Sequence, residues 1–191
     1  MKKLNPSIKI LLIFIVSSIF FSCTAPTDLT NWRDASYTKK FKKVLVVALI
    51  KDLEFRKAYE GYVSQGFIDE GITSQGSLNL LPFSSKISKA DLENVLFDGK
   101  YDGLILMKYK GTNEGERVHS YYDYYDSWYS SPAYIEKYKI VNMETALFSV
   151  EKKKLVWVGE SKTRYAHSAD MLAQSIADEI ILNLKEEKLI K

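Results

Sequence analysis

The sequence predicts an α/β (α+β) fold, in which a mixed sheet from two βαβ-type units is followed by an antiparallel hairpin and a carboxyl-terminal helix. Residues 43–50 form a continuous aliphatic run, which is typical of a strand covered on both faces. From Phe55 onward the apolar residues recur at helical spacing instead. A polar turn at 151–154 then separates two extended segments, which favours a hairpin late in the chain.

The first 22 residues have the layout of an export signal. Three lysines make a cationic start, and the apolar run over 10–21 is interrupted only by two serines. A run of about 12 apolar residues is shorter than the roughly 20 that a bilayer-spanning helix needs. We therefore expect residues 1–22 to be a lipoprotein signal peptide that is cleaved, rather than a permanent membrane helix.

Cys23 is the only cysteine in the chain and directly follows this apolar run. The stretch Phe20-Phe21-Ser22-Cys23 resembles the lipobox of bacterial lipoproteins, in which the cysteine is diacylated and becomes the first residue after cleavage. Phe20 stands where the usual box has leucine. The resemblance implies lipidation, with palmitate or similar acyl chains on Cys23, and several such chains give stable anchoring. The alternative is an unprocessed free thiol.

Residues 23–40 are expected to be the lipidated cysteine and a tether, because 24–31 are small, polar and interrupted by proline. A coil of that length spans on the order of 25 Å on average. Thr24 is not the aspartate that commonly retains enterobacterial lipoproteins in the inner membrane. That resemblance implies the outer membrane, with the domain on its periplasmic face.

The charge of the chain changes when the signal is removed. The full sequence has a net charge of +3, with 27 basic and 24 acidic residues, and three of the lysines lie within the first 22 residues. The mature chain is therefore neutral. A neutral domain without a basic stripe argues against nucleic acid as a partner and against polybasic attachment to anionic lipid.

The elements of a single globular domain over 41–191 follow in order. After the strand at 43–50 we expect a helix over 55–68 and a short strand over 77–81. A capping box beginning at Ser88 opens a second helix, and a third strand covers 101–110. Two such units in sequence imply right-handed crossovers and a partly parallel sheet.

The carboxyl half is expected to be a hairpin and a helix. Segments 134–150 and 155–162 form the hairpin, and Ser168 begins the helix. The buried face of that helix is predicted to contain Ala173, Ile176, Ala177, Ile180 and Leu184. A domain of about 150 residues buries roughly 68 to 70% of its unfolded surface, which is enough for stability without disulfides.

The segment 119–134, HSYYDYYDSWYSSPAY, lies in a predicted Tyr-rich excursion over 112–134. Tyrosine and tryptophan combine a large apolar area with a polar tip and are enriched where proteins recognise partners. Three interpretations stay open: an ordered lid on the edge of the sheet, a partner-binding surface, and a carbohydrate or peptidoglycan platform. The candidate binding residues are Tyr121, Tyr122, Tyr124, Tyr125, Trp128 and Tyr129.

Three stretches carry a resemblance to a family. They are the strand VLVVALI with its following helix, the unit DLENVLFDGKYDGLILMKY, and METALFSVEKKKLVWVGESKT before the last helix. Over about residues 41–187 the chain resembles envelope proteins related to the amino-terminal domain of TolB, the curli-secretion lipoprotein and the lipoprotein activators of penicillin-binding proteins. The resemblance implies docking or assembly with an envelope protein partner rather than turnover.

No motif assigns a reaction, a metal or a cofactor. His119 and His167 stand 48 positions apart without a local metal-binding motif, and no phosphate-binding or nucleophile-elbow pattern occurs. We expect His119 to lie in a solvated loop and His167 to lie at the start of a helix. A dispersed Ser-His-Asp arrangement using either histidine stays open.

The sequence thus favours a non-enzymatic, membrane-anchored lipoprotein that docks or assembles envelope components. The alternative is a small envelope hydrolase with an unrecognised active site, in which His119→Ala or His167→Ala would abolish turnover. An oligomeric secretion pore is disfavoured, because it would need further amphipathic segments of about 9 to 11 residues. The segments at 134–150 and 155–162 are already required by the core.

Overall fold

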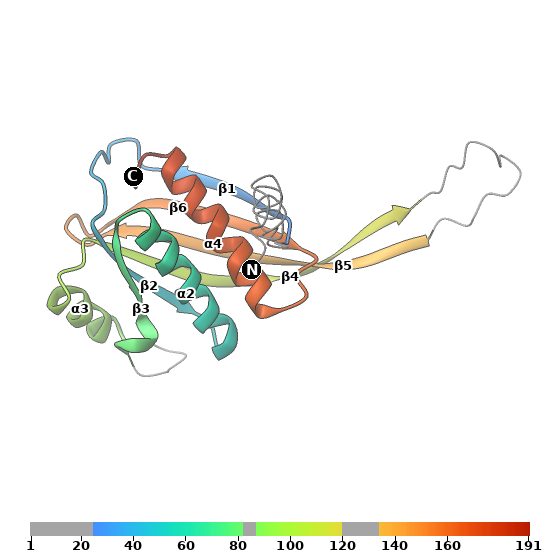
Figure 1. Cartoon of the computed structure of the whole chain (residues 1–191), viewed down its shortest axis with the longest axis horizontal. Helices are drawn as coiled ribbons and strands as arrows, with labels where there is room; N and C mark the ends of the chain where they lie inside the picture. The colour runs from blue at the N-terminus through green and yellow to red at the C-terminus, as the bar shows by residue number, and fades with distance from the viewer. Residues whose placement is uncertain (1–24, 82–86, 120–133) are drawn as a thin grey trace, which may run out of the picture.

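The computed structural model describes residues 25–81, 87–119 and 134–191 (Figure 1). One six-stranded sheet has the strand order β1-β6-β5-β4-β2-β3. This mixed sheet with its helices confirms the predicted fold class. In chain order the elements are β1 (Thr27–Arg33), β2 (Lys43–Leu49), α2 (Leu53–Asp69), β3 (Thr73–Gly76), the 3₁₀ helix η1 (Ser77–Asn79), α3 (Lys89–Asp98), β4 (Gly103–His119), β5 (Tyr134–Ser149), β6 (Lys154–Arg164) and α4 (Ala169–Glu186).

The parallel part of the sheet is formed by β2 between β3 and β4. Val44, Val46 and Ala48 face α2 and α4, whereas Leu45 and Val47 pack in a smaller cluster with residues of α3. Because β2 is covered on both faces, all five side chains are fully buried. This explains the unbroken aliphatic run in the sequence.

A cap residue begins each of the three α-helices in the described residues. The side chains of Asp52, Ser88 and Ser168 accept hydrogen bonds from the backbone N–H three residues later, at 2.9, 3.1 and 3.0 Å. Such bonds satisfy backbone donors that have no partner within the helix. The predicted helix starts at Ser88 and Ser168 are therefore confirmed.

The second strand was predicted at 77–81, and this position is wrong. The strand covers Thr73–Gly76, and Ser77–Asn79 form a 3₁₀ helix. The reason is a buried carboxylate: Glu60 accepts hydrogen bonds from the Ser77 hydroxyl at 2.7 Å and from the Leu78 N–H at 2.9 Å. The chain thus turns toward Glu60 instead of continuing along β2.

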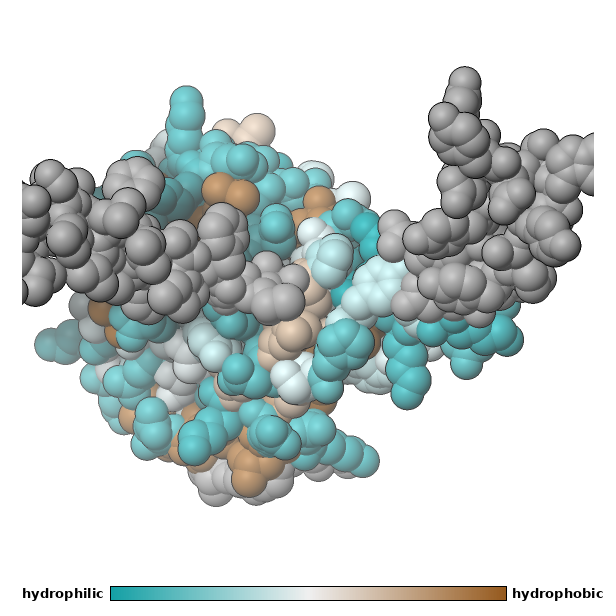
Figure 2. Space-filling view, turned by 45° about the vertical axis from the view of Figure 1, so that its right-hand side comes forward, coloured by the Kyte–Doolittle hydropathy of each residue, from teal (hydrophilic) through white to brown (hydrophobic). Residues whose placement is uncertain are grey.

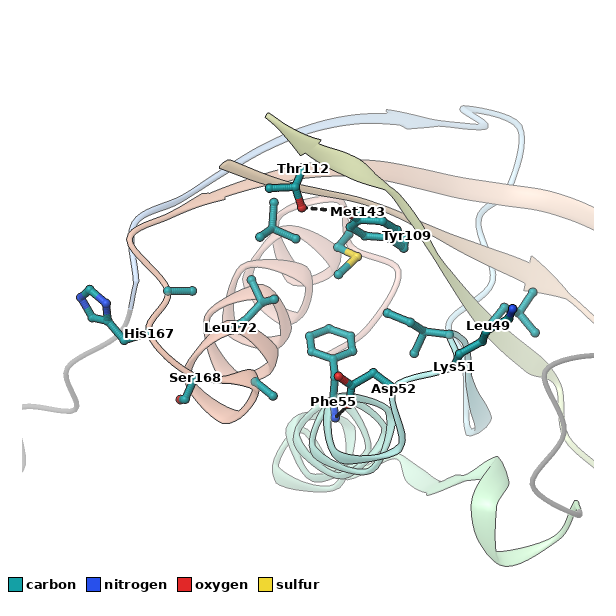
Figure 3. Close-up of a pocket in the computed structure, with 14 residues that line it drawn as sticks. Leu49, Lys51, Asp52, Phe55, Tyr109, Thr112, Met143, His167, Ser168 and Leu172 are labelled. Carbon is teal, nitrogen blue, oxygen red and sulfur yellow. Dashed lines mark hydrogen bonds between the residues drawn. The ribbon is translucent and has the colours of Figure 1, made fainter. Parts of the chain in front are cut away.

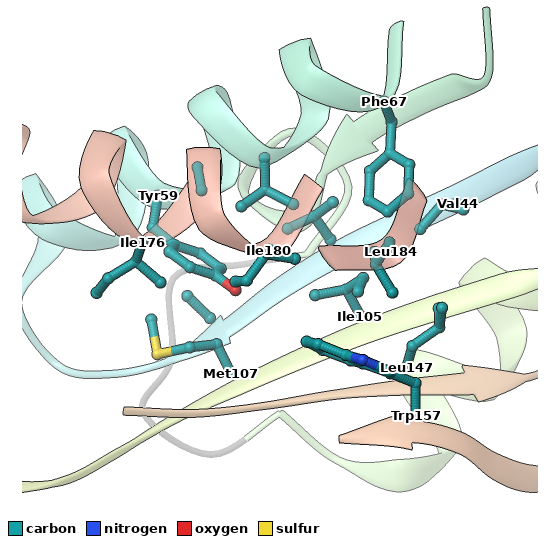
Figure 4. Packing of buried hydrophobic residues seen from close by; sticks show 14 of the residues in the cluster. Val44, Tyr59, Phe67, Ile105, Met107, Leu147, Trp157, Ile176, Ile180 and Leu184 are labelled. Carbon is teal, nitrogen blue, oxygen red and sulfur yellow. The ribbon is translucent and has the colours of Figure 1, made fainter. Parts of the chain in front are cut away.

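The main core lies between the sheet and the pair α2 and α4, which pack side by side over one face (Figure 4). Trp157 of β6 is fully buried, and its Nε1 donates to Asn183 Oδ1 at 2.9 Å. Tyr59 of α2 is also fully buried, and its hydroxyl lies 3.0 Å from that of Thr145 on β5. Burial raises the pKa of Tyr59, and the two bonds fix how the helices sit on the sheet.

The tether expected over 23–40 is wrong for the described residues from Ala25 onward. Thr27–Arg33 form the edge strand β1, which pairs antiparallel with β6. Ala25 is buried, and its N–H donates to Ser175 Oγ at 2.7 Å. The segment has the polar composition of a linker. It is a strand because its hydrogen-bond partners come from β6, about 130 residues later.

The strands β4 and β5 continue beyond the rest of the sheet. Pairing of β2 with β4 ends at Lys108, and pairing of β6 with β5 ends at Ile140. Within the described part of the chain, residues 114–119 and 134–139, which we call the arm, therefore pair only with each other. Figure 1 shows this two-stranded arm leaving the body at one end.

The arm corrects two expectations. Residues 112–119 were assigned to the Tyr-rich excursion, yet they are part of β4, and His119 ends that strand instead of lying in a loop. The alternation of polar and apolar residues in this stretch is too weak to predict a strand. Near the base of the arm, the ring of Tyr138 contacts that of Tyr165, with 4.4 Å between centroids, and this joins the arm to the body.

Candidate functional site

A cleft of about 740 Å³ lies where the arm leaves the sheet (Figure 3). We call it the arm-base cleft. Its walls come from the end of β2, the start of α2, the bases of β4 and β5, and the connection from β6 to α4. The lining residues are Leu49, Ile50, Lys51, Asp52, Phe55, Tyr109, Thr112, Val141, Met143, Ala166, His167, Ser168, Ala169 and Leu172.

Two helices begin at this cleft. The side-chain oxygens of their N-cap residues lie at the cleft and already accept backbone hydrogen bonds. Asp52 Oδ1 accepts from the Phe55 N–H, and Ser168 Oγ accepts from the Met171 N–H. Tyr62 of α2 donates to both carboxylate oxygens of Asp170 at 3.0 Å, which raises the pKa of Tyr62 and ties α2 to the start of α4. The bonds of Asp52 and Ser168 lie at the cleft, and the bond from Tyr62 lies in a neighbouring hollow.

A β-bulge forms the opposite wall. The register of β4 with β5 shifts between Tyr109 and Gly111, and Gly111 has a φ of 127°, which favours glycine. The hydroxyls of Tyr109 and Thr112 lie 2.6 Å apart. Because β-bulges redirect side chains, this shift helps to place Tyr109 and Thr112 beside the cleft.

Charge on the other face of these strands, away from the cleft, is neutralised locally. Glu144 of β5 lies 3.1 Å from the ammonium groups of both Lys108 and Lys110. Hydrogen bonds from these lysines, Lys108 first, lower the pKa of Glu144. The carboxylate is thus held ionised and paired with the two lysines.

The cleft does not assemble the dispersed triad considered from the sequence. His167 is exposed beside Ser168, and within the described ranges it forms no hydrogen bond to a serine or a carboxylate. The Ser168 hydroxyl is already the cap of α4. In the same ranges, no group of three His, Cys, Asp or Glu side chains is arranged to hold a metal ion.

Most of the predicted site residues lie outside the described residues. These are Cys23 and the candidate binding residues Tyr121, Tyr122, Tyr124, Tyr125, Trp128 and Tyr129. His119 is placed at the far end of β4, remote in sequence and in strand position from His167 beside the cleft. Across the described part of the chain, no helix combines the length and the apolar character needed to cross a membrane.

Sequence reasoning missed exposed apolar residues beside the cleft. The side chains of Leu49, Leu53 and Tyr109 are 40%, 51% and 48% exposed. Figure 2 shows hydrophobic side chains scattered among hydrophilic ones on the lower part of the body. The signal was the apolar run that continues past the end of β2 into the turn before α2.

A second groove, of about 500 Å³, lies between α3 and the other face of the sheet. Leu92 and Leu96 of α3 and Leu106 and Phe148 of the sheet line it. Phe97 is 83% exposed at its edge. The groove is largely apolar and contains no assembled polar site.

The most buried charges support the fold behind the cleft. Arg56 and Glu60 are 1% and 2% exposed, with Arg56 Nε 2.9 Å from Glu60 Oε1. The same carboxylate accepts from the Ala48 N–H at 3.1 Å, as well as from Ser77 and Leu78. Neither charge lines the cleft, so we interpret this pair as structural.

Comparison with known proteins gives a fold but no family. No protein-family model matches the chain, and no curated protein matches its sequence. Among solved structures, the PelC dodecamer from Paraburkholderia phytofirmans is similar with a TM-score of 0.50 and 10% identity, over 82% of this chain and 95% of PelC. Lipoprotein GNA1162 from Neisseria meningitidis has a TM-score of 0.44 and 10% identity, over 76% of this chain and 99% of that protein. At such identities the likeness concerns the fold alone.

Proposed function

We propose that this chain is a non-enzymatic lipoprotein, anchored through Cys23, that docks or assembles components of the bacterial envelope. We place it on the periplasmic face of the outer membrane. The observation that carries the docking role is the arm, whose strands, among the described residues, pair only with each other beyond the sheet. The fold likeness to PelC, which forms a dodecamer, is compatible with assembly.

The arm has little intrinsic stability unless it contacts another molecule. An isolated two-stranded ribbon is marginally stable in water. The six residues of each strand extend about 20 Å at roughly 3.4 Å per residue. They add little to the core, since Glu114, Glu116, Lys137 and Lys139 are exposed. A binding role accounts for an ordered element that contributes so little to the buried interior.

The exposed residues of the arm indicate a polar protein partner. Acidic side chains on β4 stand opposite basic ones on β5, with Glu116 3.7 Å from Lys137. Mixed charges of this kind favour a specific protein surface over a uniformly charged polymer. An envelope protein is therefore the proposed partner, and the Tyr-rich segment between the strands of the arm is the proposed continuation of that surface.

Site-specific photo-crosslinking in living cells tests the docking role. A photoreactive amino acid replaces Glu114 or Lys137 on the arm, and Lys57, an exposed residue of α2, is the matched control position. We expect a discrete protein adduct from the two arm positions and none from Lys57. Equal adduct patterns at all three positions would reject docking through the arm.

Metabolic labelling tests the anchor separately. Cells fed an alkyne analogue of palmitate should incorporate the label into the wild-type chain and not into Cys23→Ala. Because Cys23 is the only cysteine, no second thiol can substitute. Label that persists in the Cys23→Ala variant would contradict lipidation at this residue.

A further inference from the structure

The first described residues are packed against the rest of the domain. The Ala25 N–H is bonded to Ser175 on α4, and the Pro26 carbonyl accepts from the Arg164 N–H at 2.9 Å. Two residues further, Thr27 is already paired with Thr163 of β6. One residue, Thr24, separates Cys23 from Ala25, so their Cα atoms lie at most about 7 Å apart when the chain is extended.

The point where the chain joins the domain lies at the same end as the arm-base cleft. Thr27 pairs with Thr163, which pairs with Val141, which in turn pairs with Thr112. Val141 and Thr112 line the cleft. A lipid on Cys23 would therefore hold the domain to the membrane by this end.

This end exposes side chains suited to a lipid surface. The β2–α2 turn, residues 49–53, presents Leu49 and Leu53, and Tyr109 lies nearby on β4. Lys51 is exposed between the two leucines. Aliphatic side chains beside a tyrosine and a lysine are the composition found at the boundary between headgroups and acyl chains.

We propose that the phospholipid bilayer is the partner of this surface. When the protein is anchored, Leu49, Leu53 and Tyr109 rest in the headgroup boundary, and the arm leaves the domain from its membrane-proximal end. The inference rests on the proposed anchor at Cys23. The contact depends on apolar side chains, because Glu54 and Asp170 offset Lys51 at the same end.

Two exposed apolar residues elsewhere serve as controls. Phe97 lies at the edge of the second groove, near the start of β4, and Leu182 lies in the carboxyl-terminal half of α4. Both sit toward the opposite end of the sheet from the β2–α2 turn, and Leu182 is 52% exposed, as Leu53 is at 51%. If exposed apolar area alone were enough for contact with lipid, Phe97 and Leu182 would contact lipid as well.

The test supplies the anchor chemically. The mature chain, residues 23–191, is coupled through Cys23 to a maleimide-bearing phospholipid in vesicles of phosphatidylethanolamine and phosphatidylglycerol. The vesicles also contain a phospholipid with a diazirine in its acyl chain, and adducts are mapped by mass spectrometry after illumination. We expect adducts on residues 49–53 and on Tyr109, and none on Phe97 or Leu182.

Two variants sharpen the result. Leu53→Asp should reduce the adducts on the β2–α2 turn to background, whereas Leu182→Asp should leave them unchanged. Raising the salt to about 1 M, where the Debye length falls to about 3 Å, should also leave them unchanged. Adducts centred on Phe97 or Leu182, or their absence from residues 49–53, would overturn the proposal. Coupling in vitro does not depend on acylation in the cell, so these outcomes are separate from the palmitate labelling.

Discussion

The backbone N–H of Ala25 donates a 2.7 Å hydrogen bond to the hydroxyl of Ser175, which lies 150 residues later in the chain. The same hydroxyl donates to the Met171 carbonyl at 2.8 Å, so it both accepts and donates. This contact, together with the pairing of β1 and β6, makes residues 25–33 part of the domain. It also leaves only one residue, Thr24, between Cys23 and the packed structure.

Ser175→Ala should loosen the amino-terminal strand. The substitution leaves the buried Ala25 N–H without its acceptor, which costs about 1–3 kcal/mol. Hydrogen exchange at residues 25–33 should accelerate more than exchange in α2. Ser64→Ala is the matched control, because Ser64 Oγ is buried and has no hydrogen-bond partner in the described structure. Equal effects of the two substitutions would contradict the role given to Ser175.

Two glycines should respond in opposite directions to alanine. A Cβ at Gly159 would lie 2.6 Å from the ring of Trp157, which is fully buried and cannot move aside. Gly159→Ala should therefore lower the free energy of unfolding by about 1–3 kcal/mol. Gly61 lies within α2 with nothing near its Cβ position, so Gly61→Ala should raise it by about 0.5–1 kcal/mol. Urea unfolding of both variants measures the two changes.

Local signals in the sequence predicted the interior of the fold well. The aliphatic run of β2, the caps Ser88 and Ser168 and the turn at 151–154 each depend on residues close in the chain, and each is observed. The strand β1 was missed because what makes it a strand is β6, far away in sequence. Its own residues are those of a linker.

The candidate site was less predictable than the fold. The sequence points to histidines and aromatic residues, whereas the cleft depends on where β2 ends relative to the bulge at Tyr109 and Gly111. A register shift has no signature in a single sequence. The exposed leucines of the β2–α2 turn look like the end of a buried strand until the helix start at Asp52 is known.

Asp34 should contribute to the acid sensitivity of the domain. Hydrogen bonds from Lys154, at 2.5 Å, and from Ser36 lower the pKa of Asp34 from 3.8 to about 2. Because the pKa is lower in the folded state, this stabilisation is present above about pH 4 and is lost as the pH falls toward about 2.

Replacing Asp34 by asparagine should therefore flatten the decline of stability over that pH interval. Thermal unfolding measured at several acidic pH values gives the slope. Asp98→Asn, at an exposed position at the end of α3, is the control and should leave the slope as in the wild type. A wild-type slope in Asp34→Asn would show that Lys154 does not stabilise the ionised carboxylate.

The buried pair of Arg56 and Glu60 should dominate the stability of the β2–α2 region. Removing one partner leaves the other charge buried, so Arg56→Met and Glu60→Leu should each cost about 3–5 kcal/mol. The double variant should cost less than the sum, because no buried charge remains, although the Ala48 and Leu78 N–H groups still lack their acceptor.

Lys89 and Glu93 have the same spacing on α3 but are 88% and 62% exposed, so Glu93→Leu should change stability by less than about 1 kcal/mol. Denaturant unfolding of the four variants decides this: additive losses for Arg56 and Glu60 would mean that the two charges are not coupled. A strong coupling would mean instead that a helical Arg–Glu pair, whose spacing alone resembles a solvent-exposed one, fixes the position of α2 and with it one wall of the arm-base cleft.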